Sequence, residues 1–96
     1  MEVSIRGLLE NLIDDLTSEK GLHTAFTVIG EFKPIVKSKQ DAVFGYIIGA
    51  AFSNFAANYH ITQNRLPNTS ESEKFRILLL ERANIIMSKI QKFSQL

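Results

Sequence analysis

The segment from Ala42 to Asn64 contains 23 consecutive residues without a charge. An uncharged stretch of this length either crosses a bilayer or forms a helix at the centre of a fold. Its strongly apolar part, Ala42 to Phe52, spans only 11 residues, whereas a membrane span needs about 20. The second half is rich in Asn, Ser, Thr and Gln. We therefore expect a central helix buried on several sides, and no membrane span.

Small residues recur on one side of this predicted helix. They stand four positions apart, at Gly45, Gly49, Ser53 and Ala57, and residues at this spacing lie one above the other on a helix surface. A side that lacks large side chains lets a second helix approach closely. We therefore expect Gly45, Gly49 and Ser53 to lie at a helix–helix contact.

Three further segments have apolar residues three and four positions apart, which is typical of amphipathic helices. They run from Val3 to about Lys20, from Leu22 to Phe32 and from Ser70 to Phe93. Gly21 predicts the stop of the first helix, because glycine commonly follows a helix end. Pro34 predicts that the second is short or kinked, because proline lacks an amide hydrogen and disfavours helical geometry before it.

Two serines mark predicted helix starts. Ser38 and Ser70 are each followed three residues later by a carboxylate, Asp41 and Glu73, which is the pattern of a capping box. No strand pattern is bounded by turn residues. Because 96 residues supply only one hydrophobic core, the sequence predicts a single all-α domain over residues 1–96, a four-helix bundle.

The last two predicted helices carry more apolar surface than a four-helix monomer is expected to cover. Apolar residues occupy more than half the circumference of both, whereas a peripheral helix needs a stripe only somewhat over 100° wide. A symmetry mate would cover the second such helix. We therefore predict a homodimer, with Leu79, Ile86 and Ile90 joining Gly45, Gly49 and Ser53 in self-association.

The charges are unevenly distributed along the chain. Residues 1–31 carry two cations and six anions, whereas residues 32–96 carry nine cations and four anions. We therefore expect the first helix to face the basic last helix, whose cations are Lys74, Arg76, Arg82, Lys89 and Lys92.

The net charge of only +1 excludes binding of nucleic acid or membrane by bulk charge, although a local patch can still bind.

The sequence offers no catalytic or metal-binding motif. There is no cysteine, no phosphate-binding loop, no nucleophile elbow and no dinucleotide fingerprint. His23 and His60 have no partner at metal-ligand spacing, and Glu10 and Asp14 on one helix side are typical of a solvated face. We expect neither an enzyme nor a cofactor or metal. Without signal-peptide or transit-peptide features at the N-terminus, we expect a cytoplasmic protein.

Two small clusters are candidate sites. Asn54, Asn58 and His60 group near the end of the central helix, where they form either a helix end that reaches solvent, a satisfied hydrogen-bond network or a small polar pocket. The second cluster comprises lysines at the junction before the central helix, with an arginine that antiparallel helices would bring near: Lys33, Lys37, Lys39 and Arg65.

The function that these patterns favour is a helical interaction or regulatory module. It would self-associate and present helical surface to an unidentified protein partner. The alternative is a protein that associates weakly with nucleic acid through the lysine patch, although the apolar central helix is unsuited to lie in a DNA groove.

Overall fold

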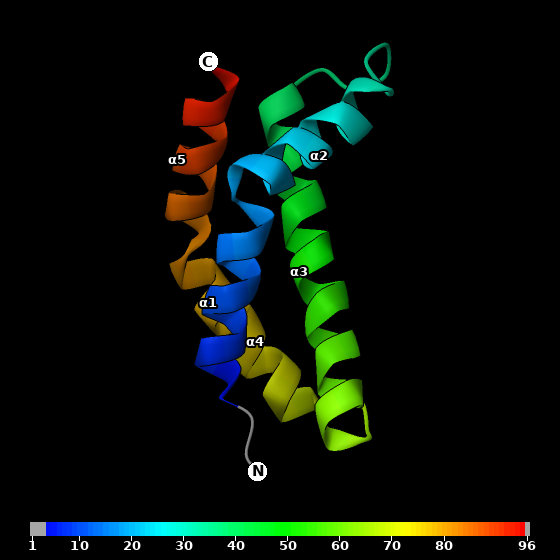
Figure 1. Ribbon diagram of the computed structural model, residues 1–96, viewed down its shortest axis with the longest axis vertical. Coiled ribbons are helices and arrows are strands. Elements are labelled where there is room, and N and C mark those ends of the chain that lie inside the picture. The colour runs from blue at the N-terminus through cyan, green and yellow to red at the C-terminus, as the bar shows by residue number, and fades with distance from the viewer. Residues whose placement is uncertain (1–3, 96) are drawn as a thin grey trace.

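The computed structural model describes residues 4–95, and within them the fold consists of α-helices without strands (Figure 1). The all-α prediction is therefore confirmed. Five helices are present rather than the four predicted, because the last segment is broken at Arg82. The helices are α1 (Ile5–Leu16), α2 (Glu19–Gly30), α3 (Lys39–Gln63), α4 (Thr69–Glu81) and α5 (Ala83–Ser94).

Helix α3 is the central element of an elongated molecule measuring 43 × 22 × 21 Å. Its 25 residues correspond to about 37 Å, and it packs against α1, α2 and α5 (Figure 1). Ser38 begins it, because the hydroxyl accepts a hydrogen bond from the amide of Asp41 (3.3 Å), as predicted. Asn64, in the left-handed conformation (φ 55°), ends it.

The core follows one row of α3. Every fourth residue is buried, and α1, α2, α4 and α5 supply the facing apolar groups. At the centre, the rings of Phe55 and Phe75 stack with centroids 4.1 Å apart, and Phe52 meets Phe75 edge-on at 5.3 Å. Helices α3 and α4 thus meet through aromatic side chains. The buried row of α3 is Val43, Ile47, Ala51, Phe55 and Tyr59.

The corner between α1 and α2 differs from the predicted one. Helix α1 ends at Leu16, and α2 begins at Glu19 with Ser18 as its N-cap, accepting from the amide of Gly21 (3.1 Å). Gly21 therefore lies in the first turn of α2 and does not stop α1. A Cβ at this position would lie 2.5 Å from the carbonyl oxygens of Asp15 and Leu16. The glycine is required by the close approach of two backbones.

Helix α2 is short, as predicted, and ends at Gly30, before Pro34. Hydrogen-bonded turns follow it, in which the carbonyl of Phe32 accepts from the amides of Ile35 (2.9 Å) and Val36 (3.0 Å). The predicted bounds of Leu22 to Phe32 were therefore late by two or three residues at each end. The loop from residue 31 to residue 38 lies at the end of the molecule opposite the first turn of α1 (Figure 1).

The predicted fourth helix is two helices. Its start is set by Asn68 and Glu71, whose side chains and amides bond reciprocally, so the predicted capping box of Ser70 and Glu73 is wrong by two residues. The amide of Arg82 donates to the carbonyl of Leu79, only three residues back, in a turn tighter than an α-helix. The Arg82 guanidinium binds Glu10 of α1 (2.7 Å). This contact confirms the predicted attraction between the first helix and the basic last segment.

Candidate functional site

A groove of about 150 Å³ lies between α3 and the junction of α4 with α5. Helix α3 supplies three large side chains to one wall. Arg76 lies in the opposite wall, where its guanidinium pairs with Glu73 (3.0 Å). Leu80 is 63% exposed, and Ile77, outside the groove on α4, is 49% exposed. The lining is otherwise apolar and comprises Phe44, Ile48, Phe52, Leu79, Leu80 and Ala83.

The small-residue stripe of α3 runs beside this groove. Gly45 and Gly49 follow Phe44 and Ile48 in the chain and so lie about 100° further round the helix. Both glycines are exposed, and apart from adjacent residues and the nearby backbone of α3 itself, no atom lies within 4 Å of a Cβ built on either. Ser53 is exposed as well. The close helix contact predicted for this stripe is therefore not made within one chain. Here "the groove face" denotes Phe44, Gly45, Ile48, Gly49, Phe52 and Leu80.

The other residues predicted for self-association lie inside the chain's own core. Leu79 is 3% exposed, and Ile86 and Ile90 are fully buried. They leave almost no side-chain surface for a second copy, although Leu79 also lines the groove, and the expectation that Ile86 and Ile90 lie at an interface is corrected. The break at Arg82 is the reason: the apolar residues on either side of it belong to two helices, and both helices turn their own apolar side to one core.

The three predicted lysines lie around one pocket at the α2–α3 end of the molecule. This pocket has a volume of about 180 Å³ and is lined by Ile29, Gly30, Lys33, Val36, Lys37 and Lys39. The ammonium of Lys39 also lies 5.8 Å from the ring centre of Phe26. Arg65 does not join the lysines, because it lies beyond the other end of α3, about 37 Å away along the helix.

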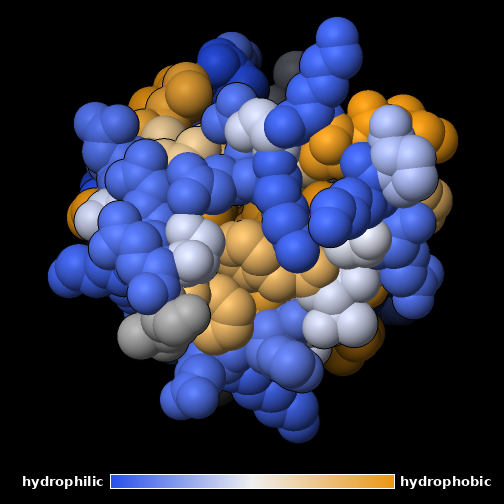
Figure 2. Space-filling view, turned by 90° about the horizontal axis from the view of Figure 1, so that it is seen from above, coloured by the Kyte–Doolittle hydropathy of each residue, from blue (hydrophilic) through white to orange (hydrophobic). Residues whose placement is uncertain are grey.

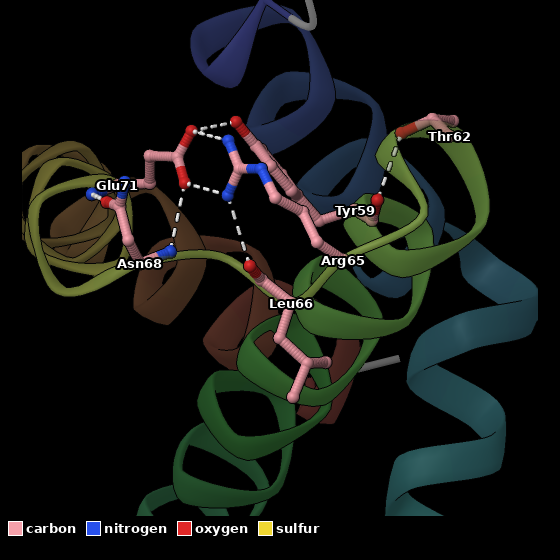
Figure 3. Close-up of polar contacts among 6 residues, drawn as sticks. All are labelled: Tyr59, Thr62, Arg65, Leu66, Asn68 and Glu71. Atoms are coloured by element: carbon pink, nitrogen blue, oxygen red, sulfur yellow. Dashed lines mark hydrogen bonds and ion pairs between the residues drawn. The ribbon is translucent and has the colours of Figure 1, made fainter.

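Arg65 instead belongs to a polar network at the corner between α3 and α4 (Figure 3). Its guanidinium binds both carboxylate oxygens of Glu71 (2.8 and 2.9 Å). The hydroxyl of Tyr59 donates to the same carboxylate, and the amide of Asn68 adds a bond of 2.9 Å. The carboxylate thus accepts four hydrogen bonds, which leaves it no free lone pair for acid–base work. We interpret this network as a clamp on the corner.

Electrostatics within the clamp stabilise the charged pair. Hydrogen bonds from Arg65, then from Tyr59 and Asn68, lower the pKa of Glu71 to about 2. The bond to Glu71 raises the pKa of Arg65 and is also the main cause of the raised pKa of Tyr59. The sequence carried a signal for this site in the Asn68–Glu71 spacing, but the similar spacing of Ser70 and Glu73 obscured it.

The predicted polar cluster near His60 reaches solvent. Asn54 and His60 are exposed, and the side-chain amide of Asn58 donates to the carbonyl of Asn54 one turn earlier (2.8 Å). These three residues lie along α3 rather than around a cavity. A polar cavity nearby has other lining residues, among them Tyr59 and Glu71.

Comparisons with protein-family models, curated proteins and solved structures found no match for this chain. Within residues 4–95, no helix combines the length and apolar character of a bilayer span. No three side chains of His, Cys, Asp or Glu in that part of the chain are grouped to hold a metal ion.

Proposed function

We propose that the protein is a small helical interaction module that pairs with a second copy of itself through the groove face. The observation that carries this proposal is the open space beside Gly45 and Gly49, next to an apolar groove. Each glycine costs a helix about 0.5–1 kcal/mol relative to alanine. Nothing in the described chain requires a glycine at either position, whereas a helix packed against this face would.

The shape of the groove face favours a second copy as its occupant. A two-fold interface brings the same patch together from both sides, so the patch must be complementary to itself. The groove face has both a ridge of large side chains, Phe44, Ile48 and Phe52, and a stripe that has none. The ridge of one copy can therefore fill the space above the glycines of the other.

Charge and area are compatible with this pairing. Residues 42–64 are uncharged, so two copies of α3 can meet without like-charge repulsion. A standard interface buries about 800 Å² of each partner, which is about one eighth of the 6417 Å² surface of this chain. The paired chains would keep the other helical surfaces free for a protein partner.

Substitution of Gly49→Leu tests the proposal by separating folding from pairing. The variant is expected to fold at least as stably as the wild type, because the site is open and leucine favours helix. It is expected to weaken self-association at least tenfold, because the side chain occupies the space that the partner's ridge would fill. Sedimentation equilibrium measures the dissociation constant, and thermal unfolding by circular dichroism measures the fold.

Asn11→Leu is the matched control, because Asn11 is an exposed helical residue of α1 outside the groove face. This variant is expected to associate like the wild type. Equal association of the wild type and Gly49→Leu would show that the glycine stripe is not the interface.

A further inference from the structure

The loop from residue 31 to residue 38 exposes two large apolar side chains. Phe32 is 51% exposed and Ile35 is 80% exposed. The backbone between them is held in place, since the carbonyl of Phe32 accepts hydrogen bonds from two amides further along the loop. Both exposed side chains therefore belong to a hydrogen-bonded turn. The loop lies at one end of the long axis (Figure 1).

Three lysines lie in this loop or at the start of α3 directly after it. Lys33, Lys37 and Lys39 are exposed and line the pocket at the base of the loop, and the residues that line this pocket include no acid. Two carboxylates, Glu31 and Asp41, flank the lysines in the sequence.

Helix α5 packs beside this end, where the side-chain amide of Gln40 donates to the hydroxyl of Ser94 (2.7 Å). It carries two lysines and no acidic residue between Ala83 and Ser94. Figure 2 looks down on this end and shows apolar groups exposed among hydrophilic ones.

We propose that this end of the molecule docks on an anionic phospholipid surface. Phe32 and Ile35 enter the boundary between headgroups and acyl chains, while the three lysines contact lipid phosphates. A bilayer surface offers both partners within a few ångströms, negative charge at the headgroups and hydrocarbon just below. A nucleic acid would use the lysines but would leave an exposed isoleucine without a partner, since its outer surface is phosphate. This site is separate from the groove face, and neither proposal depends on the other.

Co-sedimentation with vesicles tests the proposal. One set consists of phosphatidylcholine alone, and the other contains phosphatidylserine as well. The full chain is expected to bind the second set, less strongly as salt rises, and to leave the first set unbound. Lys33→Gln and Lys37→Gln are each expected to weaken binding about fivefold. The double variant Phe32→Ser with Ile35→Ser is expected to weaken it at least tenfold.

Matched controls come from the other end of the molecule. Ile61→Ser removes an apolar side chain that is 81% exposed, and Lys74→Gln removes an exposed lysine of α4. Both are expected to bind like the wild type. All of these positions are exposed, so the variants are expected to fold, which circular dichroism checks.

Three results would overturn the proposal. The first is equal recovery of the protein with and without the anionic vesicles. The second is full vesicle binding by the double variant of Phe32 and Ile35, because the site would then be only a cationic patch. If that variant were also retained on a short RNA or DNA duplex, the patch would be a nucleic-acid site. The third is saturation of the pocket by inorganic phosphate together with an absence of vesicle binding, which would identify a site for a free anion.

Discussion

Replacement of Gly21 by alanine is expected to destabilise the fold, although alanine is normally the better helix former. The added Cβ would lie 2.5 Å from the carbonyl oxygens of Asp15 and Leu16 and 2.7 Å from the carbonyl carbon of Leu16. Ordinary contact begins at about 3.4 Å, so the end of α1 and the start of α2 must separate by about 0.9 Å.

Little at this corner can move freely. The Ser18 hydroxyl both donates to the carbonyl of Asp15 (2.7 Å) and accepts from the amide of Gly21 (3.1 Å). Ile13 and Leu22 on either side are core residues, 3% and 4% exposed. Overpacking of this kind costs about 1–3 kcal/mol, and the gain in helix propensity of about 0.5–1 kcal/mol offsets only part of it. We expect a net loss of about 1–2 kcal/mol.

Urea denaturation followed by circular dichroism measures this loss, and the melting temperature should fall by about 4–16 °C. Gly30→Ala is the matched control. Its Cβ would meet only the end of the Lys39 side chain, at 3.7 Å and beyond, so stability should be unchanged or raised by up to about 1 kcal/mol. A Gly21→Ala protein as stable as the Gly30→Ala protein would refute the explanation given for this corner.

Two further predictions concern the core and the corner clamp. Phe75→Leu should lower the free energy of unfolding by about 1–2 kcal/mol in urea, because leucine keeps most of the bulk but loses the ring contacts with Phe52 and Phe55; an unchanged midpoint would contradict this. Because the pKa of Glu71 is lowered from 4.5 to about 2, its contribution to stability is present above about pH 4.5 and is lost as the pH falls towards 2. Glu71→Gln should therefore be less stable than the wild type at neutral pH, with a difference that shrinks over this acid range; a pH-independent difference would show that the charge of Glu71 does not matter.

The sequence predicted the all-helical class and the central helix, because both depend on local patterns. The predicted Ser38 cap marks the start of α3, and the uncharged stretch covers the helix from Ala42 to its last residue. Helix α1 was recognised from its apolar stripe, but its end was misplaced. Glycine after a helix is ambiguous: it suits a left-handed stop, and it equally suits a close backbone approach in the next helix, which is its role at Gly21.

The division of the last segment into α4 and α5 could not be predicted, because apolar residues continue at helical spacing through Arg82. The break coincides with a tertiary contact, the ion pair of Arg82 with Glu10, which has no local signal in the sequence. Part of the surplus apolar surface predicted for that segment remains exposed, at Ile77, Leu80 and Ile85. The part of the predicted interface that remains open is therefore on α3, with Leu80 of α4 beside it.

The lysine cluster was located by its proximity in the sequence, and the structure gathers its three lysines. The error over Arg65 came from the unknown helix arrangement, since α3 places residues 39 and 65 at opposite ends. Lys39 and Arg65 lie at the two ends of one helix, so antiparallel packing between different helices does not bring them together.

The most direct test of self-pairing through the groove face is the solution mass of the unmodified chain, measured by light scattering over a series of dilutions. We predict a mass of twice 10.8 kDa at high concentration that falls towards 10.8 kDa as the protein is diluted, with little effect of salt because the groove face is uncharged. A mass of 10.8 kDa at every concentration would contradict the account, since Gly45 and Gly49 would then face solvent in the working protein.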